Sequence, residues 1–161
     1  MIIVKLAGGS TIILATLIFY LEIQGFHKKE IKQLDAFINL IDYIKNQIEC
    51  YLLPFDEIIR FCDSSLLTEC GITPNMLKAN NLKEIISQVD YYFDEAAIEL
   101  IYDFAEKFGH TYSKEQVASC EHCKNLLTKI KEKMIENENK NQKMRLALSL
   151  CVSFSIIILL L

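Results

Sequence analysis

The stretch IKQLDAFINLIDYIKNQIECYL, residues 31–52, decides the fold of the middle of the chain. Its apolar residues recur at steps of three and four, at Ile31, Leu34, Ile38, Ile41, Ile44, Ile48 and Leu52. This spacing places them on one face of an amphipathic α-helix, because a helix turns once in about 3.6 residues. Pro54 ends this helix or begins the next one. A helix with one apolar face must pack against other elements, so the stretch predicts a helical domain.

Shorter helical segments are predicted at FDEIIRFC, SSLLTEC and LKEIISQV, and a longer one at DEAAIELIYDFAEKF. Gly71 and Gly109 are predicted to terminate helices. Thr73 and Pro74 have the form of an N-cap followed by proline at the first helical position. No segment alternates apolar and polar residues over strand length, and no repeat of 20–50 residues is present. The domain is therefore predicted to be an all-α, compact helical bundle.

The next helix is predicted to begin at Ser113. Ser113 and Gln116 form a capping box, in which the serine covers an exposed backbone N–H and the glutamine reaches back. One face of this helix carries Val117, Cys120, Cys123, Leu127, Ile130 and Met134. The segment ENENKNQK, residues 136–143, is wholly polar. We expect the helix to run on through it toward the end of the chain.

The segment CEHC, residues 120–123, is the one that invites chemistry. Two cysteines at this spacing begin a zinc site or form a redox pair in other proteins. A closed zinc site needs two further ligands, and the sequence has no second pair at metal-ligand spacing, although Cys62, Cys70 or His110 could approach in the fold. Because Cys120 and Cys123 lie on the apolar helix face, core packing is the favoured interpretation, and His122 is expected in solvent. A redox- or metal-responsive membrane protein remains the alternative.

Other function classes have little support in the sequence. The net charge is −4 and no basic stripe is present, which argues against nucleic acid as a partner. Glycine-rich phosphate loops and the common hydrolase and metalloprotease motifs are absent. We therefore expect a protein that is not an enzyme and has no catalytic residue, metal, cofactor or small-molecule substrate. Its six cysteines are predicted to be reduced thiols buried as small hydrophobes.

Both ends of the chain are apolar. Residues 146–161 and 6–21 carry no charge, and a helix of about 20 such residues crosses the ~30 Å hydrocarbon core of a bilayer. Transmembrane helices are therefore expected at 2–23 and 144–161, flanking a domain at 27–140. A cleaved signal peptide is the rival interpretation of the first, but FYLEIQGFHKK offers no small-residue cleavage site.

The orientation in the membrane follows from the basic residues near the two helices. His27, Lys28, Lys29 and Lys32 follow the first, and Lys140, Lys143 and Arg145 precede the second. Basic residues concentrate on the cytoplasmic side. The central domain is therefore expected to face the cytoplasm, with both termini outside and the chain stopping once it has crossed.

Each terminal helix also carries a stripe of small residues at steps of four. The stripes consist of Ala7, Thr11 and Ala15 in the first helix, and of Ala147, Cys151 and Ser155 in the second. Small residues let membrane helices approach closely. We expect these stripes to pack on each other or on partner subunits.

The segment FAEKFGHTYSKEQ resembles a motif of the stage III sporulation protein AB family, through Phe104, Ala105, Phe108, Gly109 and Gln116. Lys143 and Met144 fall where the family places a basic residue and methionine before its final helix. QIECYLLPFDEII is similar to an upstream family segment through Glu49, Pro54, Glu57 and Ile58. Two positions differ from the family pattern: Ala105 replaces a glycine, and Tyr112 replaces an acidic residue.

The resemblance implies a structural role. The family is similar to the cytoplasmic domains of inner-membrane platform proteins of type II secretion and type IV pilus machines. It implies a platform in the channel complex that joins mother cell and forespore, with other stage III sporulation membrane proteins and a secretion-type ATPase as partners. Gly109, Ser113 and Gln116 are expected to form the turn that orients the long helix. Glu49 is expected to make an interaction or a structural hydrogen bond. A membrane-tethered adaptor of an unrelated system is a further alternative.

Overall fold

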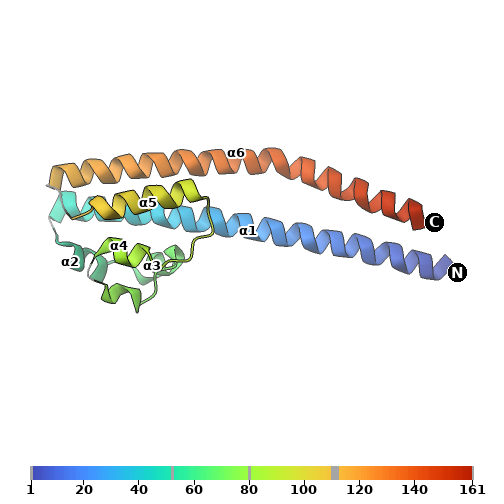
Figure 1. Cartoon of the computed structure of the whole chain (residues 1–161), viewed down its shortest axis with the longest axis horizontal. Helices are drawn as coiled ribbons and strands as arrows, with labels where there is room; N and C mark the ends of the chain where they lie inside the picture. Colours follow the sequence, from blue (N-terminus) through green and yellow to red (C-terminus); the bar gives the residue numbers. More distant parts are fainter. Residues whose placement is uncertain (1, 52, 80, 110–112, 161) are drawn as a thin grey trace. The chain divides into compact units, whose positions relative to one another are not determined.

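The computed structural model describes residues 2–51, 53–79, 81–109 and 113–160, with side chains except at 2–13, 55, 56, 142, 153, 156, 157, 159 and 160. All regular structure in these residues is helical, which confirms the predicted all-α class. The elements are α1 (Ile2–Tyr51), α2 (Phe55–Arg60), α3 (Ser64–Cys70), the 3₁₀ helix η1 (Met76–Lys78), α4 (Leu82–Ile86), α5 (Glu95–Lys107) and α6 (Ser113–Leu160). Figure 1 shows this order along the chain.

The chain forms two compact units, which we describe separately. The central unit comprises Lys29–Lys133, and the terminal unit comprises Met1–Lys28 with Met134–Leu161. The helices α1 and α6 contribute to both. The predicted continuation of the long helix through residues 136–143 is confirmed, because α6 is unbroken from Ser113 to Leu160. The sequence predicts two separate helices, one at 2–23 and one beginning at Ile31. In the structure they form the single helix α1, which runs through Gly25 without a break.

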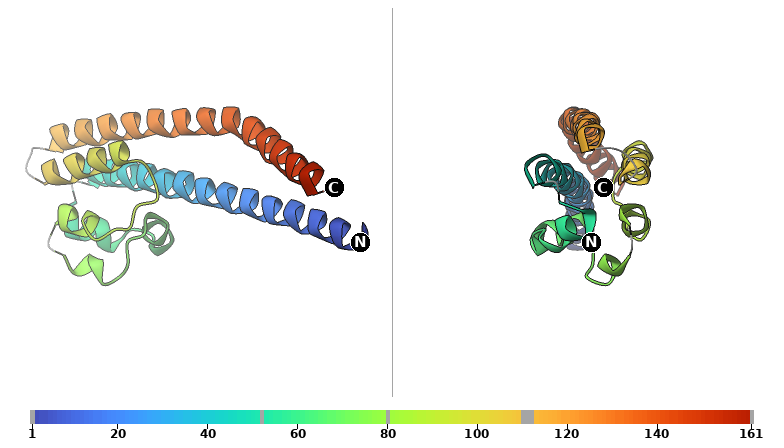
Figure 2. Two further views of the ribbon diagram at one scale, coloured as in Figure 1. Left: turned by 45° about the vertical axis from the view of Figure 1, so that its right-hand side comes forward. Right: turned by 90° about the vertical axis from the view of Figure 1, so that its left-hand side faces the viewer.

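The core of the central unit is built on α1. Its buried face includes the predicted residues Leu34, Ile38, Ile41, Ile44 and Ile48. The long helices α1 and α6 lie side by side in this unit, with the shorter α5 beside them and α2, α3 and α4 along another side of α1 (Figure 2). Burial of these branched side chains is the main source of stability in such a domain.

An aromatic cluster joins α1 to the segment before α5. The ring of Phe37 lies 5.7 Å from that of Tyr91 and 5.9 Å from that of Phe93, centroid to centroid. The Tyr91 ring also lies 6.3 Å from that of Tyr102 on α5. These separations are typical of favourable aromatic pairs. The cluster therefore ties α1, residues 91–93 and α5 into one body.

Three ion pairs fix how α1 and α6 align in the central unit. They are Asp35–Lys131 at 2.6 Å, Asp42–Lys124 at 2.5 Å and Lys45–Glu121 at 3.8 Å, between carboxylate oxygen and Nζ. Steps of seven and then three residues along α1 match equal steps backward along α6, so the helices are antiparallel in one register. Partly exposed pairs contribute about 0.2–1 kcal/mol each. This ion-pair ladder therefore specifies register more than it adds stability.

The short helices begin and end largely where their sequences indicate. Pro54 is the N-cap of α2, and Asp94 caps α5 by accepting a hydrogen bond from Glu95 N–H at 2.9 Å. Asp63 caps α3, and the backbone N–H of Ser65 holds the pKa of its carboxyl below the usual value. The prediction for Thr73 and Pro74 was wrong, because they lead into the 3₁₀ helix η1 rather than an α-helix. Residues 72–79 are too few and too turn-rich to sustain α-helical hydrogen bonding.

Gly71 and Gly109 adopt left-handed backbone conformations, with φ of +87° and +84°. A Cβ at residue 109 would meet nothing within 4 Å, whereas one at residue 71 would lie 3.2 Å from Gln33 Nε2. We expect Gly109→Ala to lower the free energy of unfolding by about 1 kcal/mol through backbone strain, and Gly71→Ala to lower it by more. Chemical denaturation of the purified full-length chain, followed by circular dichroism, measures both losses.

Gly25→Ala is the matched control for these substitutions, because Gly25 lies inside α1 and a Cβ there also meets nothing within 4 Å. Alanine is favoured over glycine inside a helix by roughly 0.5–1 kcal/mol, so this variant should be at least as stable as the natural chain. Equal losses in all three variants would contradict the assignment of strain to positions 71 and 109.

Candidate functional site

The CEHC segment lies in the core of the central unit. Cys120 is fully buried and Cys123 is 3 % exposed, which confirms the packing interpretation, while His122 is exposed as predicted. Cys123 Sγ lies 3.9 Å from the carbonyl oxygen of Leu100 on α5. Among the described residues, no group of three or more His, Cys, Asp or Glu side chains is arranged to hold a metal ion. Both cysteines therefore belong to the core, and Cys123 packs α6 against α5.

Burial also sets the protonation of these thiols. Desolvation raises the pKa of Cys120 to about 11 and that of Cys123 to about 12. The reactive form of cysteine is the thiolate, so both groups are held in the unreactive form at neutral pH. A redox or metal role requires the opposite shift.

These pKa values predict a loss of stability in alkali. A thiol whose pKa rises on folding contributes stability that is complete below its ordinary value of 9.0 and is lost as the pH rises through about 11. We expect the free energy of unfolding to fall over this range, and less so in the Cys120→Ala, Cys123→Ala double variant. Denaturation series at pH 8 to 11 test this. Rapid alkylation of both thiols in the folded chain at pH 7 would contradict it.

The other cysteines divide between core and surface. Cys62 and Cys70 are buried, as predicted, and desolvation raises the pKa of each thiol. Cys50 and Cys151 are exposed, so the prediction that all six are buried was wrong. Cys50 lies near the end of α1, on the side away from its buried face.

The predicted turn residues lie between α5 and α6. Gly109 is exposed, with φ +84°. Ser113 is the first residue of α6. Gln116 is partly buried and is not without an interaction partner. Residues 110–112 lie outside the described residues, as does His110 as a zinc-ligand candidate. The capping box therefore stays a prediction. The left-handed conformation of Gly109 ends α5.

Glu49 and Pro54 lie at the same end of the central unit as this turn, because the antiparallel pairing of Lys45 with Glu121 places the last turn of α1 beside the start of α6 (Figure 1). Glu49 is exposed on the last turn of α1. The Pro54 carbonyl accepts hydrogen bonds from the N–H groups of Glu57 and Ile58, both at 3.1 Å, and so starts α2. Pro54 therefore separates α1 from α2. The role of the exposed Glu49, in an interaction or a structural hydrogen bond, stays a prediction.

Gln33 is a structural residue that sequence analysis missed. It is the buried polar residue of the described core, at 4 % exposure. Its Nε2 donates to the carbonyls of Cys70 at 3.0 Å and Asp90 at 2.8 Å, and its Oε1 accepts from Tyr92 N–H at 2.9 Å. One side chain thus links α1 to the end of α3 and to the loop between α4 and α5. Gln33 lies one helical turn before the buried Phe37, and this spacing is the sequence signal that could have predicted its burial.

A polar cluster joins α1 and α6 within the terminal unit. Arg145 Nη1 lies 3.3 Å from Glu138 Oε2 and 3.1 Å from His27 Nε2, and His27 Nε2 lies 3.5 Å from the same carboxylate oxygen. All three side chains are partly buried. The cluster fixes the antiparallel pairing of the two helices at this level.

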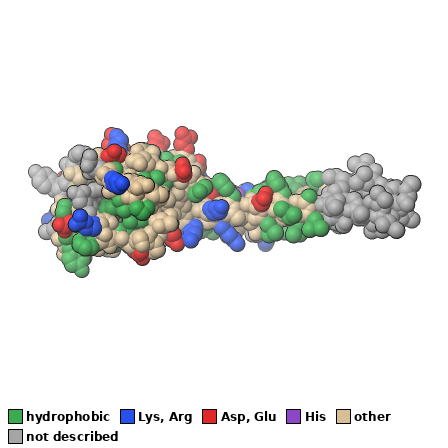
Figure 3. Space-filling view, turned by 90° about the horizontal axis from the view of Figure 1, so that it is seen from below, with side chains coloured by type: hydrophobic (Ala, Val, Ile, Leu, Met, Phe, Trp, Pro, Cys, Tyr) green, Lys and Arg blue, Asp and Glu red, His purple; other side chains and the backbone are tan. Residues whose placement is uncertain are grey.

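Beyond this cluster the terminal unit exposes large apolar side chains on both helices. They include Leu14, Leu17, Ile18, Phe19, Leu21, Met144, Leu148, Val152, Phe154 and Ile158, each more than half exposed. Figure 3 shows hydrophobic side chains gathered on the visible face of this unit. In the part of the chain that the structure describes, no helix meets the length and hydropathy needed to cross a bilayer.

The small-residue stripes are only partly visible. Ala15, Ala147, Cys151 and Ser155 are exposed, and Ser155 Oγ donates to the Cys151 carbonyl at 2.8 Å. The side chains of Ala7 and Thr11 lie outside those described. Packing of these stripes on each other or on partner subunits stays a prediction.

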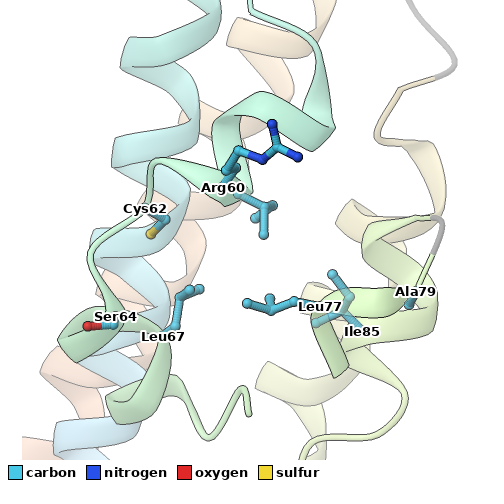
Figure 4. A pocket seen from close by; sticks show the side chains of 8 residues that line it. Arg60, Cys62, Ser64, Leu67, Leu77, Ala79 and Ile85 are labelled. Carbon is cyan, nitrogen blue, oxygen red and sulfur yellow. The ribbon is translucent and has the colours of Figure 1, made fainter. Parts of the chain in front are cut away.

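A cavity of about 590 Å³ opens between α2 and α3 on one side and η1 and α4 on the other. It is lined by Ile59, Arg60, Cys62, Ser64, Leu67, Leu77, Ala79 and Ile85. Leu67 and Leu77 point toward one another across it, and Arg60 lies at its edge (Figure 4). None of these residues was singled out from the sequence as a site.

Comparison with known proteins identifies the family to which this chain belongs. No curated protein matches the chain, and no solved structure does. The family model of stage III sporulation protein AB matches residues 5–161. The match covers both units and all the helices described above. The chain therefore belongs to the stage III sporulation protein AB family, which implies a role in sporulation.

Proposed function

We propose that this chain is a non-enzymatic membrane platform in the complex that links mother cell and forespore in endospore-forming bacteria. The observation that carries the proposal is the exposure of large apolar side chains on both helices of the terminal unit. Water-exposed apolar surface of this extent is rare unless a membrane or a partner covers it. The two terminal segments, 2–23 and 144–161, are its proposed membrane anchors.

The central unit is proposed to face the mother-cell cytoplasm. Lys28 and Lys29 follow one proposed anchor, and Lys140 and Lys143 precede the other, all exposed. Basic residues at these positions favour retention on the cytoplasmic side. The central unit is a compact helical body in which Cys120 and Cys123 are buried free thiols. This supports a role in holding partners rather than in catalysis, and it weighs against the redox alternative.

The proposed partners are other stage III sporulation membrane proteins and a secretion-type ATPase. In-cell cross-linking during sporulation, followed by purification through a tag on this chain, tests them. We expect recovery of the ATPase together with membrane proteins of the complex. Failure to recover any of them, in a preparation where a second tagged component brings down the complex, would refute the platform role and favour the unrelated adaptor.

A further inference from the structure

The cavity between α2–α3 and η1–α4 has the size of a binding site. Its volume of about 590 Å³ lies within the roughly 300–1,000 Å³ range of ligand pockets. Branched aliphatic side chains from each of the surrounding segments line it: Ile59, Leu67, Leu77 and Ile85. These aliphatic side chains favour an apolar group in contact with them, while Arg60 and Ser64 contribute polar surface to the same cavity.

Arg60 gives this cavity a charge preference. It is exposed on the last turn of α2 and lies at the cavity edge (Figure 4). Asp63, the carboxylate three residues later, accepts a hydrogen bond from Ser65 N–H. No carboxylate among the described side chains forms an ion pair with Arg60. A guanidinium beside several aliphatic side chains is suited to a carboxylate attached to an aliphatic group.

The surface beside the cavity favours a protein segment over a small amphiphile. Phe61 lies between two residues that line the cavity, and its side chain is 67 % exposed. Aromatic and arginine side chains are residue types that dominate protein–protein binding energy. A peptide segment is long enough to enter the cavity and also contact the exposed surface next to it, whereas a small molecule inside the cavity is not.

We propose that the cavity lined by Leu67 and Leu77 docks an aliphatic side chain of a partner protein, with an Asp or Glu of the same segment paired to Arg60. This inference deepens the proposed function, on which it rests, by naming the surface through which the central unit holds a partner. Pairing of the partner carboxylate with Arg60 orients the segment, and burial of the aliphatic side chain supplies most of the affinity.

Site-specific photo-cross-linking in sporulating cells tests the docking site. The photoreactive residue p-benzoylphenylalanine replaces Phe61, an exposed aromatic residue next to Arg60 that does not line the cavity, so that the cavity stays open. The matched control carries it at His122, which is exposed on α6. We expect an adduct from position 61 alone, mapped by mass spectrometry to an acidic and aliphatic segment of another protein. Arg60→Glu should reduce its yield about tenfold, and Arg60→Lys should preserve most of it.

Restoration of the adduct provides a further check. Reversal of the mapped carboxylate to lysine in the partner should recover the adduct of the Arg60→Glu chain. Absence of any adduct, an adduct to lipid or to a second copy of this chain, or a yield unaffected by Arg60→Glu would each overturn the docking site. If the tagged purification still recovers the complex, the platform role stands and only the docking site is wrong.

Discussion

Replacement of Gln33 by leucine should lower the free energy of unfolding of the full-length chain by about 3 kcal/mol. The variant loses the hydrogen bonds to the carbonyls of Cys70 and Asp90 and from the N–H of Tyr92. Cys70 is fully buried, so its carbonyl has no ready access to water. A buried polar group left without a partner costs roughly 1–3 kcal/mol. Denaturation followed by circular dichroism measures the loss.

The matched control is Gln47→Leu, which changes the same residue type on the same helix. Gln47 is partly exposed in the native chain. A surface substitution of this kind changes stability by about 0.5 kcal/mol at most. If Gln33→Leu were no more destabilising than Gln47→Leu, the hydrogen bonds of Gln33 to the end of α3 and to the loop before α5 would contribute nothing to stability.

Substitution of Val152 by arginine should prevent the second proposed anchor from inserting. Val152 is 56 % exposed and lies at the middle of the proposed span 144–161. An arginine at the centre of a membrane helix costs about 2.5–3.5 kcal/mol on insertion scales. This corresponds to a loss of insertion of about 100-fold. The readout is an alkaline phosphatase fused after Leu161, which is active only outside the cytoplasm.

The control for this substitution is Ile135→Arg, also on α6 but before the proposed span. Ile135 is 38 % exposed, so an arginine there remains in water. The natural chain and this control should give equal phosphatase activity, and Val152→Arg should give little. Equal activity in all three fusions would show that residues 144–161 do not cross a membrane.

Much of the fold was predictable because the spacing of apolar residues and the residues that end helices indicated the same elements. The spacing of Leu34, Ile41 and Ile48 identified the buried face of α1, and left-handed Gly71 and Gly109 ended helices as expected. Burial of Cys120 and Cys123 followed from their place on the apolar face of α6. In each case one local rule sufficed, since the feature lies within a single helix or at its end.

Features that depend on two distant segments were missed. The ladder of Asp35–Lys131 and Asp42–Lys124 left a trace in the sequence, acids seven apart on α1 and lysines seven apart on α6, but charge spacing alone does not pair two helices. The role of Gln33 depends on carbonyls 37 and 57 residues away. The continuity of α1 through Gly25 was missed because glycine is only a weak helix breaker.

The most direct test of the membrane account is the labelling of the two exposed cysteines, Cys50 and Cys151, with a membrane-impermeant maleimide. Cys50→Ser and Cys151→Ser variants identify which thiol reacts. We expect no labelling in intact cells, labelling of Cys50 alone once the membrane is permeabilised, and labelling of Cys151 only after detergent. Two results together would contradict the proposed anchors and the platform role built on them. Cys151 would be labelled as fast as Cys50 before detergent is added, and alkaline carbonate would extract the chain from membranes.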